Sequence, residues 1–154
     1  MYRLRNLLGF FSLLLIMTST SVFAQQAINL EDGLAIQGYD PVSYFSGSPV
    51  PGKSSITASY NNAIYNFSSE RNKALFLESP DQYLPQYGGW CAYAMLEGDS
   101  VDINPESFKI IDGKLYLFYD GFWGDTLKRW NKLTDKQPET ELVTTANKHW
   151  NELD

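Results

Sequence analysis

The sequence of 154 residues contains one cysteine and one histidine, so the side chains that most often bind transition metals or act as nucleophiles and bases are scarce. The lone Cys91 has no second cysteine with which to form a disulfide inside the chain. Positive charge is also in short supply, with 12 Lys and Arg against 18 Asp and Glu. A negative surface repels nucleic-acid phosphates and anionic lipids, so binding to nucleic acid or to membrane surfaces is disfavoured.

Long apolar runs are absent except at residues 7–17, which follow Arg3 and Arg5. This run is shorter than the roughly 20 residues that a helix needs to cross a bilayer. Val22 and Ala24 then place small residues at the two positions that a signal peptidase reads. We therefore predict a signal peptide over residues 1–24, cleavage after Ala24, and a periplasmic or secreted protein without stable membrane insertion.

The rest of the chain, residues 25–154, has the length of one domain. About 130 residues can bury roughly two-thirds of the surface of the unfolded chain. Aromatic residues make up 15% of the sequence, so large rings can build the core without disulfides. We predict a single domain with no repeats and no linker.

Turn residues divide this domain into short strands. Asn61 and Asn62 separate two runs of strand-forming residues, and Asp112 and Gly113 separate two more. Asparagine, aspartate and glycine tolerate the left-handed backbone that two-residue hairpin loops require. The sequence therefore predicts two β-hairpins with tight turns.

Helix starts are marked by capping residues. Ser68 or Ser69 can cap a helix to about residue 79, and Asp125 can cap one to about residue 133. A last helix is predicted over residues 139–152, and a short one after Asp40. Hairpins interspersed with short helices, without regular βαβ alternation, indicate an α+β fold in which a small antiparallel sheet packs against the helices.

Residues 85–95 hold the densest group of adaptable and reactive side chains, namely Gly88, Gly89, Trp90, Cys91, Tyr93 and Met95. As a strand, this stretch would place Cys91, Tyr93 and Met95 on one face. As a helix, it would start after the glycine pair and end at Gly98, which suits a C-terminal cap. Two alanines and the closing glycine favour the helix.

Cys91 has two interpretations. An unpaired cysteine commonly packs as a small hydrophobic residue. In the first turn of a helix, however, the positive end of the helix dipole would stabilise its thiolate and make it reactive. Around it, Gly88 and Gly89 would either let a backbone approach a ligand or form a turn, and Trp90 and Tyr93 would either wall a pocket or fill the core.

Met95 and His149 are the candidate partners of Cys91 in a metal site. On a helix, Met95 and Cys91 would lie close enough to share a soft ion such as Cu(I), whereas on a strand they would not. His149 could act as a further ligand or as a base for Cys91. Alternatively, neither residue binds a metal: Met95 fills space in the core, and His149 is a half-exposed histidine on the last helix.

Several separated motifs, taken in order, resemble a YHS domain. They are Tyr-Asp-Pro-Val-Ser-Tyr-Phe at 39–45, the run 60–67, Ser-Ser-Glu-Arg-Asn at 68–72, Phe76, and Ser-Pro-Asp-Gln-Tyr at 79–83. Residues 85–94 and 112–117 are similar to the exported stand-alone branch, often described as YHS domain-containing (seleno)proteins. The resemblance implies one YHS-like domain over residues 25–154 with a C-terminal helical extension.

The resemblance also carries expectations about chemistry. YHS domains and the related TRASH domains occur in proteins that handle copper and mercury, where cysteines bind the metal. Residues 67–69 read Phe-Ser-Ser where those domains carry Phe-Cys-Ser, so their paired-cysteine site is absent here. In the selenoprotein members, the selenocysteine is expected at the position of Cys91, which implies a functional thiol.

Three functions follow from these observations. The first is an exported YHS-type binding module that holds a soft metal (copper first) or a small ligand next to Cys91. Its candidate ligand-binding residues are Gly88, Gly89, Trp90, Cys91 and Tyr93, and its candidate metal ligands are Cys91, Met95 and His149. The second is a thiol-based redox enzyme or sensor with Cys91 as its catalytic residue. The third is a structural or partner-binding domain in which Cys91 is only packed.

Overall fold

The computed structural model describes residues 27–153, so the predicted signal peptide lies outside the described residues. The strands are β1 (Leu30–Glu31), β2 (Leu34–Ala35), β3 (Lys53–Tyr60), β4 (Ala63–Phe67), β5 (Asn104–Ile111), β6 (Lys114–Phe118), β7 (Asp120–Gly121) and β8 (Gly124–Asp125). The α-helices are α1 (Glu70–Glu78), α2 (Pro80–Tyr83), α3 (Thr126–Thr134) and α4 (Glu139–Glu152). Four 3-10 turns complete the described elements, namely η1 (Ile36–Gly38), η2 (Ser43–Ser46), η3 (Gln86–Gly89) and η4 (Ala94–Glu97).

The first sheet has the strand order β1-β2-β4-β3. The β2–β4 contact is parallel and the other two are antiparallel, so the sheet is mixed. Tyr60 pairs with Ala63, which leaves Asn61 and Asn62 as a two-residue loop with φ of 48° and 63°. Both asparagines thus adopt the left-handed backbone of a tight hairpin, and the prediction of this hairpin is confirmed.

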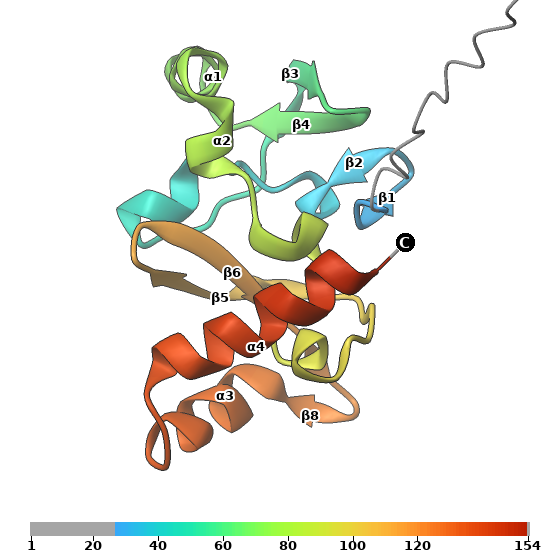
Figure 1. Ribbon diagram of the computed structural model, residues 1–154. Coiled ribbons are helices and arrows are strands. Elements are labelled where there is room, and N and C mark those ends of the chain that lie inside the picture. The colour runs from blue at the N-terminus through green and yellow to red at the C-terminus, as the bar shows by residue number, and fades with distance from the viewer. Residues whose placement is uncertain (1–26, 154) are drawn as a thin grey trace, which may run out of the picture.

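The β5–β6 hairpin lies at the centre of the molecule. Figure 1 shows it between the β3–β4 hairpin with α1 and α2 on one side and α3 and α4 on the other. Asp112 and Gly113 form its loop with φ of 49° and 73°, as predicted. Because β6 is covered on both faces, its residues 115–118 are all buried, and they alternate between two cores.

The two cores share this hairpin. The first core is built from Ala35, Ile36, Val42, Tyr44, Ala63, Tyr65, Phe67, Phe76, Cys91, Ile103, Leu115 and Leu117. The second is built from Tyr87, Ala92, Met95, Ile111, Tyr116, Phe118, Trp130, Leu142 and Ala146. The helices α3 and α4 therefore pack against the β5–β6 hairpin in the second core. The predicted α+β fold is confirmed.

The caps at two helix starts agree with the sequence. The Ser69 hydroxyl accepts a hydrogen bond from the Asn72 N–H at 3.2 Å, and the Asp125 carboxylate accepts one from the Lys128 N–H at 2.9 Å. Helix α4 has the predicted bounds. The short helix predicted after Asp40 is the single 3-10 turn η2, which Gly47 with φ of 79° follows as its C-terminal cap.

None of the helices in residues 27–153 has the length and apolar character that spanning a bilayer requires.

Candidate functional site around Cys91

The backbone around Cys91 differs from the predicted helix. The N–H groups of Cys91 and Ala92 donate to the carbonyl oxygens of Val101 and Leu117 at 2.9 and 2.8 Å. These long-range bonds hold residues 91 and 92 outside a helix, so helical structure is limited to the turn η4. The predicted end at Gly98 is correct, because its φ of 80° closes the turn. A turn this short gives no basis for the expected dipole effect on Cys91.

The thiol of Cys91 is buried, with 0% of the residue exposed. Its Sγ accepts a hydrogen bond from the Tyr119 N–H at 3.3 Å and lies 3.4 Å from Thr126 Oγ1. The Thr126 hydroxyl donates its single hydrogen to the Tyr119 carbonyl at 2.7 Å, so the S–H group is the donor to Thr126. As a neutral thiol, Cys91 therefore has both a donor and an acceptor partner.

A cavity of about 330 Å³ lies beside this thiol. Its lining residues are Cys91, Tyr93, Ala94, Glu97, Asp99, Val101, Tyr119, Trp123, Thr126 and Arg129. They come from the segment before η4, the turn η4 itself, the loop after it, the residue after β6, the β7–β8 hairpin and the helix α3. The cavity thus joins residues up to 38 positions apart around one sulfur atom.

An exposed aromatic pair stands next to the cavity at the tip of the β7–β8 hairpin. Phe122 is 90% exposed and Trp123 is 75% exposed, and their rings pack edge to face at 5.0 Å. Two bonds fix the backbone of Trp123: its N–H donates to the Tyr119 hydroxyl at 3.2 Å, and its carbonyl accepts from Arg129 at 2.7 Å. The backbone that carries this indole is therefore held in place, while most of the surface of the side chain faces solvent.

Of the predicted ligand-binding residues, the structure places Cys91 and Tyr93 at the cavity. Gly88 and Gly89, with φ of 59° and 87°, form the turn η3 instead. A Cβ at Gly88 would lie 3.1 Å from the Trp150 ring, so the glycine is needed for close packing. The Trp90 indole donates to the Ala27 carbonyl at 2.8 Å, and neither Trp90 nor the glycine pair lines the cavity.

The three predicted metal ligands are not brought together at the cavity. Met95 is fully buried in the second core, and Cys91 belongs to the first. His149 Nδ1 lies 3.3 Å from the Met95 carbonyl oxygen, and neither Met95 nor His149 lines the cavity. Within the described part of the chain, no three His, Cys, Asp or Glu side chains are grouped as a metal site would require.

Sequence reasoning missed most of the cavity walls. Thr126 and Tyr119 contact the thiol from positions 35 and 28 residues away, which no short motif indicates. Trp123 did leave a signal, because Phe122 and Trp123 lie between Gly121 and Gly124. Two large aromatic residues in a glycine-flanked turn have little room to be buried, and this pattern predicts an exposed contact surface.

No protein-family model matches the chain, and searches of curated proteins and of solved structures gave no significant match either. Membership of the YHS family thus stays a prediction. The Ser68 hydroxyl, which the resemblance aligns with a cysteine of that family, donates to the buried Asp40 carboxylate at 2.6 Å.

Proposed function

We propose that the protein is an exported binding module whose cavity beside Cys91 takes a small, mostly apolar ligand that contains an aromatic ring. One observation carries the proposal: the single cysteine of the chain, Tyr93 and Trp123 are among the residues that line a cavity of about 330 Å³. A cavity of about 150 Å³ accepts benzene, so this one has room for a molecule of about two rings.

Aromatic contacts would supply most of the affinity. Offset or edge-to-face ring pairs contribute about 0.5–1.5 kcal/mol beyond the burial of their surface. Each 100 Å² of apolar surface that a ligand covers adds about 2.5 kcal/mol. Trp123 is the main source of such surface because it is 75% exposed and its backbone is already fixed.

The charges at the cavity favour a neutral or cationic ligand. Glu97 and Asp99 line it together with one cation, Arg129. The Arg129 guanidinium donates to the Trp123 carbonyl, so one of its N–H groups is already used inside the protein. Two carboxylates against one engaged cation repel an anionic ligand.

The same geometry supports the soft-metal version of this function less well. Cu(I) bound at Cys91 would need further soft or imidazole ligands. Neither Met95 nor His149 lines the cavity, so Met95 would have to leave the second core and His149 would also have to move to reach the ion. A small organic ligand needs no such rearrangement.

A reactive thiol is the second candidate function, and the hydrogen bonds at Sγ favour it. The Thr126 N–H also donates to the Tyr119 carbonyl, at 2.9 Å. The Thr126 hydroxyl is therefore free to turn toward the sulfur without leaving that carbonyl unpaired. A thiolate at Cys91 would then accept two hydrogen bonds, from Tyr119 and from Thr126. Against this function, the thiol has no surface exposed to solvent.

Export and membership of the YHS family are part of the proposal. The order of motifs from residue 39 to residue 117 supports the family, and the apolar run near the N-terminus supports export. The burial of Cys91 is compatible with an oxidising compartment, because a thiol without exposed surface is protected from pairing with another chain.

The test is a calorimetric titration of the purified protein with indole. In Ala94→Phe, the new ring occupies the cavity, and we expect indole binding to weaken by at least about ten-fold. Trp123→Ala removes an exposed side chain, should leave the fold intact, and should weaken binding by a similar factor. The control is Ala74→Phe on the exposed face of α1, which should bind as the wild type does. Equal affinity in the wild type, Ala94→Phe and Trp123→Ala would reject the proposal.

Two further measurements separate the alternatives. Copper(I) is titrated into the wild type and into Cys91→Ser, and identical affinities would remove Cys91 from any metal site. The rate of alkylation of Cys91 is measured against pH with iodoacetamide. A thiol that reacts only after unfolding would reject the redox function and leave the binding and structural functions.

A further inference from the structure

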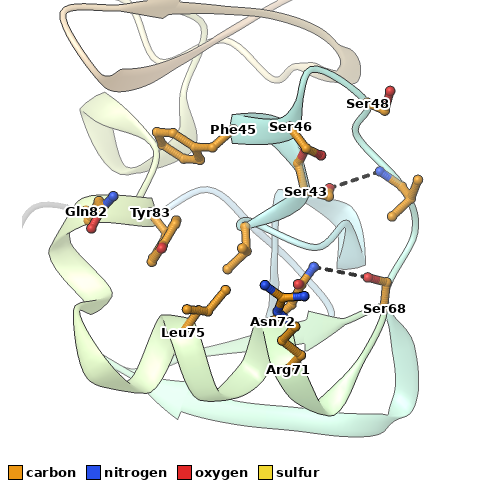
Figure 2. Close-up of a pocket in the computed structure, with 12 residues that line it drawn as sticks. Ser43, Phe45, Ser46, Ser48, Ser68, Arg71, Asn72, Leu75, Gln82 and Tyr83 are labelled. Carbon is orange, nitrogen blue, oxygen red and sulfur yellow. Dashed lines mark hydrogen bonds between the residues drawn. The ribbon is translucent and has the colours of Figure 1, made fainter.

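A second, larger cavity is a groove between the turn η2 and the helices α1 and α2. Its volume is about 510 Å³, within the range of roughly 300–1,000 Å³ that is typical of small-molecule sites. Figure 2 shows Ser43, Phe45 and Ser46 along one side and Arg71, Asn72 and Leu75 along the other. It shares no lining residue with the cavity at Cys91, so the proposed function makes no use of it.

The walls of the groove are held together by the buried carboxylate of Asp40. Its Oδ2 accepts hydrogen bonds from the Ser68 N–H at 2.8 Å, the Ser68 hydroxyl at 2.6 Å and the Asn72 amide at 2.7 Å. Its Oδ1 accepts from the Val42 N–H at 2.9 Å. These bonds connect the segment before η2 to α1 directly, so the groove is formed before any ligand arrives.

The same bonds determine which polar groups remain for a ligand. The hydrogens of the Ser43 and Ser68 hydroxyls are donated to Asp40, at its carbonyl and at its carboxylate. The Asn72 amide nitrogen is also directed inward. The strongest remaining donor is the Arg71 guanidinium, which makes no ion pair or hydrogen bond with any residue in 27–153.

The charge of the groove is opposite to that of the protein. The chain has an excess of acidic residues, yet none of the twelve lining residues is acidic and Arg71 is the basic one. The negative charge of Asp40 is compensated by four donors, and Asp40 does not line the groove. An arginine with a free planar guanidinium matches the two oxygens of a carboxylate.

The rest of the lining offers apolar surface. Leu75 lies one helical turn after Arg71 on α1, on the same face. Phe45 and Tyr83 pack edge to face at 5.3 Å and belong to the same groove. We propose that this groove binds a small organic carboxylate, whose oxygens pair with Arg71 and whose apolar part packs on Leu75 and the Phe45–Tyr83 pair.

The test is an NMR titration of the ¹⁵N-labelled protein with three probes: benzoate, benzyl alcohol and inorganic phosphate. Benzoate should give saturable shifts at the amides of Ser46, Asn72 and Leu75, whereas the uncharged benzyl alcohol should give none. In Arg71→Gln, the affinity for benzoate should fall by about ten-fold or more. Lys73→Gln removes the same charge from α1 outside the groove and should bind benzoate as the wild type does.

Three outcomes would overturn the proposal. The first is equal benzoate affinity in the wild type and in Arg71→Gln. The second is the absence of saturable shifts at the groove with benzoate. The third is phosphate binding with the same dependence on Arg71 and no preference for benzoate, since a plain anion site needs no apolar surface. None of these outcomes bears on indole binding at Cys91, because the two cavities are separate.

Discussion

Asp40→Asn replaces one oxygen of a fully buried carboxylate with an amide nitrogen, and we expect the free energy of unfolding to fall. The four donors around Asp40 lie 2.6–2.9 Å from its oxygens, three on Oδ2 and one on Oδ1. The amide oxygen of asparagine can keep the three bonds on the Oδ2 side. Its NH₂ group then faces the N–H of Val42, which loses its acceptor.

A hydrogen bond to a charged group contributes about 1.5–3 kcal/mol, and a buried donor without a partner costs about 1–3 kcal/mol. The loss of one bond and the weakening of three others therefore predicts that the free energy of unfolding falls by about 3 kcal/mol. This is a large part of the 5–15 kcal/mol that is typical of a domain.

The assay is urea denaturation, monitored by circular dichroism. Asp135→Asn is the matched control, because Asp135 is exposed and accepts no side-chain hydrogen bond within the described residues. The control should change the free energy by less than about 0.5 kcal/mol. A change in Asp40→Asn no larger than that of the control would refute the energetic role of this network.

Three other predictions concern stability. Glu139→Gln should lower the free energy of unfolding by about 1 kcal/mol near neutral pH. Partial burial acts to raise the pKa of Glu139, but hydrogen bonds from Lys109 and Trp130 outweigh it and hold this pKa below 4.5. The stabilisation is therefore lost as the pH falls below 4.5 and through this lowered pKa, so the difference in the free energy of unfolding between wild type and variant should vanish there in urea titrations. Gly52→Ala should lower the free energy of unfolding by about 2 kcal/mol or more in the same assay, because a Cβ at Gly52 would lie 2.4 Å from the Asn66 backbone. Gly47→Ala should lower it by only about 1 kcal/mol, because only the left-handed φ of 79° opposes alanine there. Burial raises the pKa of Tyr65 to about 12 and raises the pKa of Tyr44 and Tyr87 further, so the contribution of these three tyrosines to stability should be constant below pH 10.0 and be lost as the pH rises beyond it, with the ultraviolet signal of these phenolates appearing only on unfolding.

Local signals explain why much of the fold could be predicted from the sequence. The hairpin loops at Asn61 and Asp112 and the caps at Ser69 and Asp125 each depend on a few adjacent residues. These residues adopt the same backbone in most surroundings, because the left-handed conformation and the capping bond are local preferences. The parallel β2–β4 contact left no such trace, since it joins residues 30 positions apart.

The candidate site could be predicted only in part. Cys91 and Tyr93 were found because an isolated cysteine and a glycine-rich aromatic stretch are visible in the sequence. The helix expected over this stretch is cut short by bonds to Val101 and Leu117, which are tertiary contacts. The same holds for Asp40, whose bond from the Val42 N–H spans only two residues and is local, whereas its bonds from Ser68 and Asn72 span 28 and 32 residues.

The central claim is that a ligand binds in the cavity that Cys91 lines, and the single cysteine of the chain makes a direct measurement feasible. Protein labelled with ¹³Cβ-cysteine gives one resonance, which reports on this residue alone. With indole added, we expect a saturable shift of this resonance in the wild type and no shift in Ala94→Phe, with the Ala74→Phe control behaving as the wild type does. A Cys91 resonance that stays unchanged while indole saturates the wild-type protein would contradict the claim.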